Sequence, residues 1–203
     1  MRPDADGQRR ATVVARAGAE LISTTKLFDV LAEFGEPHPS GSFFAGLAVR
    51  PEIDILLLTP AAASDEVRQH IGRRVAHVLH AGAADHAVQP IAGSSEQKHF
   101  IRVTTPPRTV TERDAHLEWT IDIAVWHEST WRKRYGKPKI SPWITALDDA
   151  GRALVVAAKA QLLDTGRRTS MTTLDICQAV VTGQLTCLTD LNRILAVPPG
   201  GRP

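Results

Sequence analysis

The sequence predicts an α+β protein, in which a mixed β-sheet with flanking helices is followed by a C-terminal helical bundle. Its composition, 43% hydrophobic and 23% charged over 203 residues, is that of a globular protein with a sizeable core. Short β-rich runs that alternate apolar and polar residues all lie before about residue 130. After about residue 143 the apolar residues recur at helical spacing. Strands and helices are thus separated along the chain, which favours this fold class.

The first half of the chain supplies the expected sheet. Residues 1–10 are polar, and we expect them to be disordered. Helical spacing then predicts a helix that Thr24 or Thr25 caps. Ser64 is the expected N-cap of a second helix over 64–82, whose first turn is acidic. The expected strands are 52–58, 99–105 and 116–126.

The second half of the chain is expected to be helical. The run 143–164 has helical periodicity and predicts one helix or a helix pair. Helices over 172–183 and 188–196 follow it. The expected division is a disordered N-terminus (1–10), a sheet domain (11–130), a basic linker (131–142), a helical subdomain (143–196) and a disordered tail (197–203).

Charge, cysteine content and hydropathy exclude several classes of protein. The net charge of +2 does not by itself indicate a nucleic-acid partner. Cys177 and Cys187 lie ten residues apart without metal-binding spacing, which indicates reduced thiols in a cytoplasmic protein. No apolar run approaches the roughly 20 residues that a membrane span needs. The N-terminal residues also lack the apolar segment of a signal peptide, so we expect no membrane partner.

Two of the predicted strands carry acids on one face. Side chains alternate between the faces of a strand, so Glu52 and Asp54 share the face opposite the isoleucines of 52–58. In 116–126, Asp122 likewise lies opposite an apolar face. The alternative is that these acids lie on the exposed faces of half-solvated strands, but aspartate is disfavoured in strands.

The acid-bearing faces predict a magnesium site. Leu56 and Ala124 lie further along the same two faces, which indicates that those faces are partly covered. Converging carboxylates repel each other unless a cation lies between them. Mg²⁺ is a hard ion that takes carboxylates together with substrate phosphates. We therefore expect Glu52, Asp54 and Asp122 to bind Mg²⁺, with two ions in the site.

A Gly-Ser pair precedes the first acidic strand. If Gly41 and Ser42 open a short helix over 42–48, their backbone N–H groups and the Ser42 hydroxyl would face an anion. Gly46 would permit close approach of backbone or ligand. A Gly-Ser turn alone is far more typical of an ordinary loop. Its short distance from an acid-x-acid strand, followed by an apolar run, makes it informative.

These motifs together resemble the nucleotidyltransferase superfamily, which shares the fold of DNA polymerase beta. The matching residues are Gly41-Ser42, Glu52-Ile53-Asp54 and Asp122, and Gly46 matches the glycine that often follows the pair. The spacer of nine residues is short, and Glu52 stands where aspartate is usual. The resemblance implies an NTP substrate, with Gly41 and Ser42 on its triphosphate. Asp122 is the expected acceptor of the proton from the attacking hydroxyl.

The helical half contains a lysine in an apolar helix face. Lys159 has valines one turn before it and leucines one turn after it. Such a lysine either extends to the solvent at the rim or meets an anion in a pocket. The order of Lys159, Arg167 or Arg168, and Asp175 resembles AbiEii-type toxins, including MenT-like transfer-RNA-modifying toxins. That resemblance implies that Lys159 and an arginine contact the nucleotide and that Asp175 supports the site; capping-box chemistry is the alternative for Asp175.

The segment 131–139 combines basic and aromatic residues, because Trp131 and Tyr135 alternate with five cations. Cations bind phosphates and aromatic rings stack on bases, so this composition favours single-stranded RNA or the end of a transfer RNA. A solvated linker is the alternative interpretation. The five basic residues are Arg132, Lys133, Arg134, Lys137 and Lys139.

The sequence therefore favours a Mg²⁺-dependent nucleotidyltransferase that transfers NMP from NTP to an acceptor hydroxyl. A transfer-RNA 3′ end as acceptor would make the chain the toxin of a toxin–antitoxin system, with a cognate antitoxin protein as partner. A protein hydroxyl or a small antibiotic of aminoglycoside or lincosamide type is the alternative acceptor. A non-catalytic nucleotide- or RNA-binding module with a decayed site is the alternative from another class. An endonuclease is disfavoured, because an acid followed by E-x-K is absent from both acidic strands.

Overall fold

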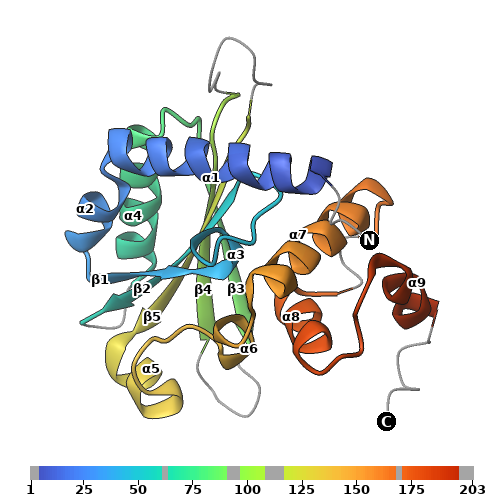
Figure 1. Cartoon of the computed structure of the whole chain (residues 1–203). Helices are drawn as coiled ribbons and strands as arrows, with labels where there is room; N and C mark the ends of the chain where they lie inside the picture. The colour runs from blue at the N-terminus through green and yellow to red at the C-terminus, as the bar shows by residue number, and fades with distance from the viewer. Residues whose placement is uncertain (1–4, 61–63, 91–96, 108–116, 168–170, 197–203) are drawn as a thin grey trace. The chain divides into compact units, whose positions relative to one another are not determined.

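The computed structural model describes residues 5–60, 64–90, 97–107, 117–167 and 171–196. The chain divides into two compact units. The sheet unit comprises Ala15–Phe44 and Pro51–Lys139. The helical unit comprises the described parts of Met1–Val14, Ala45–Arg50 and Ile140–Pro203. Figure 1 shows the elements of both units, and the predicted α+β class is confirmed.

The sheet has five strands in the order β1-β2-β5-β4-β3. Strands β2 and β5 are parallel, and every other neighbouring pair is antiparallel, so the sheet is mixed. The expected strands 52–58, 99–105 and 116–126 correspond to β2, β4 and β5. The strands are β1 (Glu36–Ser40), β2 (Glu52–Thr59), β3 (Ala84–Pro90), β4 (Gln97–Thr104) and β5 (Thr120–His127).

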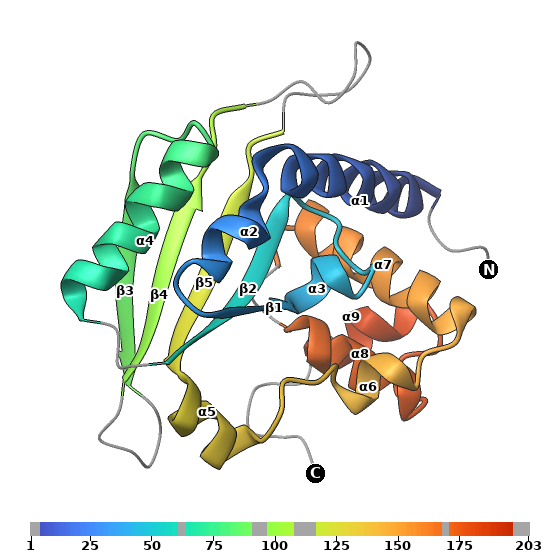
Figure 2. The ribbon, with the colours of Figure 1, turned by 90° about the vertical axis from the view of Figure 1, so that its left-hand side faces the viewer.

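One face of the sheet is buried under helices. Figure 2 shows α2 (Leu27–Ala32) and α4 (Asp65–Val78) along this face. Ile53, Ile55 and Ile121 are at most 1% exposed. Ser64 caps α4 as predicted, because its side chain accepts a hydrogen bond from the backbone N–H of Val67.

The N-terminal part of the chain differs from the sequence prediction. Helix α1 (Ala5–Thr25) includes residues 5–10, where we expected disorder; residues 1–4 lie outside the described part of the chain. Thr24 and Thr25 end α1 and do not cap α2, because their hydroxyls donate back to the carbonyls of Glu20 and Leu21. None of the described helices is long and apolar enough to cross a membrane.

The helical unit is built from short helices around a shared apolar core. The predicted run 143–164 is a helix pair, and Asp148 starts its second member by accepting a hydrogen bond from Gly151 N–H at 2.7 Å. Thr172 caps the next helix. The tail 197–203 lies outside the described residues. The helices are α6 (Pro142–Thr145), α7 (Asp149–Asp164), α8 (Thr173–Val181) and α9 (Leu188–Ala196).

Two short helices lie where the sequence predicted other structure. The helix expected over 42–48 is shorter, α3 (Gly41–Phe44). Helix α5 (Glu128–Tyr135) occupies the start of the expected basic linker 131–142, and its residues belong to the sheet unit. The division into a sheet domain and a helical subdomain at that linker stays a prediction.

Candidate functional site

The three acids predicted to converge lie together in the sheet unit. Asp54 and Asp122 are register partners in the parallel pair β2·β5, and Glu52 lies two residues before Asp54. Ligand oxygens of the three carboxylates all lie within 4.8 Å of one another, and each residue is half-buried. The convergence predicted from strand alternation is therefore confirmed.

The buried isoleucines determine where these carboxylates point. Ile53, Ile55, Ile121 and Ile123 fill the core, so a shift of one residue in either strand would bring acids into that core. Glu52 pairs with Thr120, two residues along the strand from the two aspartates, and at roughly 3.3 Å per residue this is a step of about 6.6 Å. The extra methylene of Glu52 helps its carboxylate to span that step.

The acid-bearing face is partly covered further along the same strands, as predicted. Leu56, Leu58 and Trp126 form a small buried cluster on it. Trp131 of α5 packs against this cluster. The acids thus lie on a face whose other end is closed by aromatic and aliphatic side chains.

Arg102 is the residue of this site that the sequence interpretation missed. It lies on β4 as the register partner of Asp122. Its Nε donates to Asp122 Oδ1 at 2.7 Å and one terminal nitrogen donates to Oδ2 at 2.7 Å. The hydrogen bond to Asp122 and that carboxylate's charge, with smaller contributions from Glu52 and Asp54, raise the pKa of the guanidinium. Alternation in β4 puts Arg102 opposite Ile101 and Val103, but its meeting with Asp122 depends on strand order.

Gly41 brings the Gly-Ser turn against the acidic strand. Its φ of +71° lies in the left-handed region, and a Cβ there would collide with the Asp54 carboxylate. Gly46 has a similar φ of +70°, but a Cβ there would meet nothing within 4 Å. Among the described residues, the positive φ is therefore the one reason for a glycine at position 46. At position 41, glycine is needed both for the positive φ and for the close approach of the Asp54 carboxylate.

The donor set fits a divalent cation. Carboxylate oxygens are the ligands that Mg²⁺ and similar hard ions take in proteins. Glu52 and Asp54 come from one strand and Asp122 from its neighbour, so the sheet itself holds the three groups in place. Arg102 makes a bidentate contact with Asp122, so one cationic side chain already lies at the edge of the cluster.

In the helical unit, Lys159 binds the segment Ala45–Arg50. Its Nζ donates to the Leu47 carbonyl at 2.7 Å. Arg152, seven residues earlier on α7, donates to the carbonyls of Ala45 at 2.9 Å and Ile144 at 3.3 Å. The contact of Lys159 with a nucleotide stays a prediction.

The other residues of this unit predicted to contact the nucleotide are Asp175, Arg167 and Arg168. Asp175 forms a capping box with Thr172, which confirms its alternative interpretation: Asp175 Oδ2 accepts from Thr172 N–H at 2.8 Å. Arg167 is exposed, and Arg168 lies outside the described residues. Nucleotide binding by these three residues stays a prediction.

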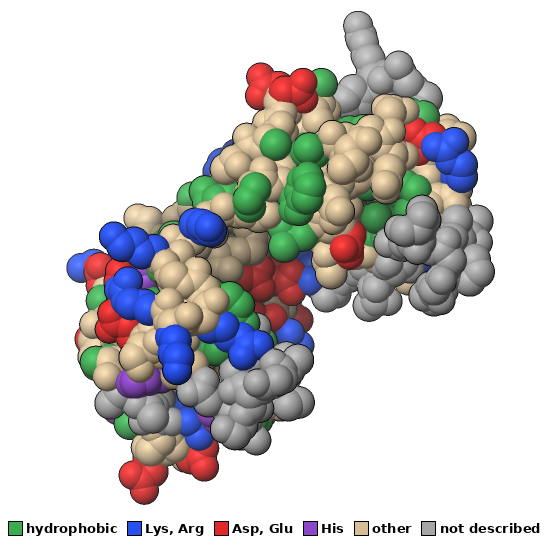
Figure 3. All heavy atoms as spheres, turned by 90° about the horizontal axis from the view of Figure 1, so that it is seen from below, with side chains coloured by type: hydrophobic (Ala, Val, Ile, Leu, Met, Phe, Trp, Pro, Cys, Tyr) green, Lys and Arg blue, Asp and Glu red, His purple; other side chains and the backbone are tan. Residues whose placement is uncertain are grey.

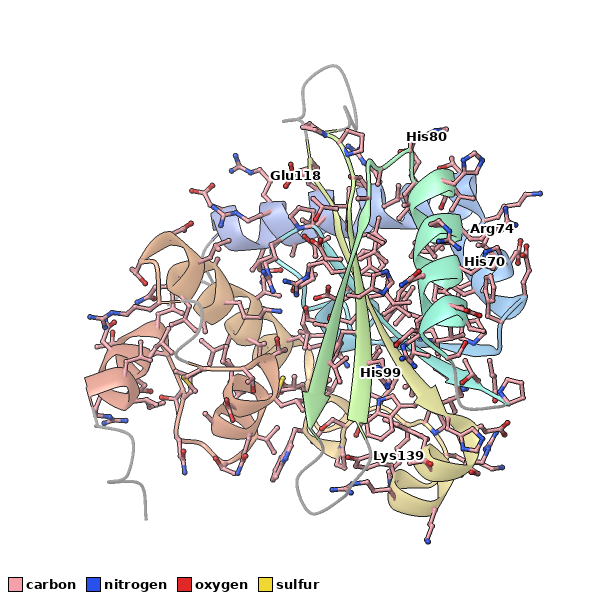
Figure 4. The ribbon with its side chains drawn as sticks, turned by 180° about the vertical axis from the view of Figure 1, so that it is seen from behind. His70, Arg74, His80, His99, Glu118 and Lys139 are labelled. Carbon is pink, nitrogen blue, oxygen red and sulfur yellow. The ribbon has the colours of Figure 1, made fainter. Side chains whose placement is uncertain are left out.

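The basic segment 131–139 combines packed and exposed side chains. Trp131 packs edge-to-face against Trp126, with 5.3 Å between the ring centroids. Arg132 forms ion pairs with Glu128 and Glu36. Figure 3 shows several Lys and Arg side chains on the face of the sheet unit from which α5 projects in Figure 1. Nucleic-acid binding by the segment stays a prediction, and its exposed cations are Arg132, Lys133, Arg134, Lys137 and Lys139 (Figure 4 labels Lys139).

Of the comparisons with known proteins, the one with solved structures gives matches. No family model matches the chain, and no curated protein matches it. A structure of Cid1, described with RNA terminal uridylyl transferase activity, matches 74% of this chain and 40% of its own at 16% identity and a TM-score of 0.39. A structure of Cid1 with its short product ApU matches 80% of this chain and 42% of its own at 13% identity and a TM-score of 0.37. The chain thus spans about two fifths of the length of these structures.

Proposed function

We propose that this chain is a metal-dependent nucleotidyltransferase that transfers NMP from NTP to an acceptor hydroxyl. The observation that carries the proposal is the cluster of Glu52, Asp54 and Asp122, whose ligand oxygens lie within 4.8 Å of one another. In the reaction, the acceptor oxygen forms a bond to the α-phosphorus. The bond from that phosphorus to the bridging oxygen breaks, and pyrophosphate leaves.

Each residue of the sheet unit has a distinct part in this proposal. The three carboxylates would hold divalent metal, and a bound ion would supply Lewis-acid charge to the triphosphate and acidify the attacking hydroxyl. Asp122 accepts the proton of that hydroxyl. Gly41 and Ser42 bind the triphosphate through backbone N–H groups and the Ser42 hydroxyl; the close approach of Gly41 to Asp54 supports this role.

The helical unit supplies the remaining charge in this proposal. Lys159 and an arginine, Arg167 or Arg168, neutralise the triphosphate, and Asp175 supports the site. The basis of this part of the proposal is the order of Lys159, the two arginines and Asp175 along the chain.

The acceptor that we propose is a transfer-RNA 3′ end, which makes the chain a growth-inhibiting toxin with an antitoxin partner. The exposed cations of segment 131–139 support an RNA acceptor, because they are suited to a phosphate backbone. A protein hydroxyl and a small antibiotic are the other acceptors to be tested.

The test compares wild-type protein with D54A in transfer of labelled NTP to total RNA and protein. Loss of a metal ligand should lower labelling by at least about 100-fold. The matched control is E118A, which removes an exposed acid that precedes β5 (Figure 4) and should keep wild-type labelling. Equal labelling by D54A and wild type would refute the proposal.

A second assay separates the acceptors and the non-catalytic alternative. Purified transfer RNA, total protein and an aminoglycoside–lincosamide panel are each incubated with labelled NTP and Mg²⁺. Labelled transfer RNA, together with a growth defect that D54A abolishes, would support the toxin. Thermal stabilisation by NTP and Mg²⁺ without pyrophosphate release would instead favour a binding module with a decayed site.

A further inference from the structure

We propose that Arg102 is the resident counter-cation of the acidic cluster and competes with a divalent ion for Asp122. The inference rests on the proposed function only in taking Glu52, Asp54 and Asp122 as metal ligands. Arg102 is then a positioning residue, which keeps Asp122 in place when metal is absent and weakens metal binding.

The first step is the geometry of the pair. Both oxygens of Asp122 accept hydrogen bonds from Arg102, each at 2.7 Å. A carboxylate offers about four lone-pair positions, so two remain open. A divalent ion using those positions would lie beside a guanidinium of the same sign, and each cation would weaken the binding of the other.

The second step is the charge of the cluster. Three carboxylates whose oxygens lie within 4.8 Å of one another are expected to repel. Arg102 brings one positive charge to the edge of that cluster through its contact with Asp122. In metal-free protein this contact offsets part of the repulsion. A bound divalent ion offsets it more completely and makes the arginine superfluous.

The third step is the freedom of Arg102 to leave. Its side chain is 57% exposed, whereas that of Asp122 is 17% exposed. Strand pairing fixes the backbone of both residues, so separation requires only rotation of the arginine side chain into water. Because a guanidinium on a long side chain remains well solvated in water, moving Arg102 away from Asp122 costs little free energy.

The experiment measures binding of Mn²⁺ alone by titration calorimetry, in the absence of nucleotide. R102Q keeps a polar side chain and removes the charge. We expect it to bind Mn²⁺ on the order of twofold to fivefold more tightly than wild type, the range that a partly exposed ion pair allows. R102K keeps the charge but loses the bidentate fork, so its gain should be smaller.

Two further variants control for general effects. R74Q removes a similar exposed pair elsewhere in the sheet unit. Arg74 on α4, labelled in Figure 4, donates to both oxygens of Glu33 at 2.9 and 3.1 Å. R74Q should leave Mn²⁺ affinity unchanged. D122N should lower Mn²⁺ affinity. In metal-free protein the melting temperature of R102Q should fall below that of wild type, and saturating Mn²⁺ should remove the difference.

The outcomes decide the inference separately from the proposed function. Equal or weaker Mn²⁺ binding by R102Q would overturn it, and so would the absence of Mn²⁺ binding in both proteins. Tighter binding by R102Q supports it even if no NTP is consumed, in which case only the proposed function fails. Nucleotide transfer by wild type with unchanged Mn²⁺ affinity in R102Q would leave the function and remove the inference.

Discussion

At the scale of single residues, Gly41 is the point where the Gly-Ser turn and the acidic strand meet. Gly41 and Gly46 have nearly the same positive φ, but only Gly41 lies against a side chain, that of Asp54. We expect G46A to lower the free energy of unfolding by about 1 kcal/mol, the cost of a left-handed alanine. G41A should cost at least about 2–3 kcal/mol, because the added Cβ also displaces the Asp54 carboxylate.

Urea unfolding and Mn²⁺ titration of both glycine variants check this expectation. G41A should lose Mn²⁺ affinity because Asp54 moves, whereas G46A should keep it. Equal losses of stability and of Mn²⁺ affinity in the two variants would show that close approach to Asp54 is not what distinguishes Gly41.

Single residues were predictable from the sequence where local periodicity decides their position. Alternation placed Glu52, Asp54 and Asp122 on the faces opposite the buried isoleucines. Arg102 obeys the same alternation, but its partner follows from the antiparallel pairing of β4 with β5. Strand order is a tertiary property, so no local pattern could identify the Arg102–Asp122 pair.

At the scale of elements, two side chains of α7 hydrogen-bond to the backbone of the segment 45–50, which joins α3 to β2. Arg152 and Lys159 lie seven residues apart, two turns along the same helix face. Both donate to backbone carbonyls of Ala45–Arg50. R152M and K159M should each lower the free energy of unfolding by about 1–3 kcal/mol, because a carbonyl of low accessibility loses its charged donor.

The same two variants test the nucleotide role proposed for Lys159. Stability is measured by urea unfolding, and affinity by NTP titration in the presence of Mg²⁺. If Lys159 also neutralises the triphosphate, K159M should weaken NTP binding clearly more than R152M does. Equal NTP affinity in R152M and K159M would limit Lys159 to holding the Leu47 carbonyl.

The elements that the sequence did not predict have weak local signals. Strand β1 contains two prolines in five residues, which is tolerated because β1 lies at an edge of the sheet. Strand β3 lies at the other edge and lacks a clear apolar alternation. Helix α1 begins in a polar stretch, and Val14, Ala17 and Leu21 further along it are buried. Tertiary packing therefore decides these three elements.

At the scale of the whole molecule, the chain passes between the two units four times, after residues 14, 44, 50 and 139. The sequence indicated only the last of these passages, at the basic segment. Leu47 and Val49 look like the beginning of the next apolar strand. They are 0% and 3% exposed, and both belong to the core of the helical unit.

Because residues 45–50 belong to the helical unit, we expect that the sheet unit will not fold properly when the chain is cut after residue 139. A fragment of residues 1–139 lacks the helices that bury Leu47 and Val49, so it should aggregate or bind a hydrophobic dye. Replacing both residues with serine should increase the soluble fraction of this fragment. In the full chain the same double substitution should destabilise by several kcal/mol, because it places hydroxyls in a packed core. A fragment that is soluble and unfolds cooperatively without the substitutions would contradict this expectation and favour a single domain boundary at the basic segment.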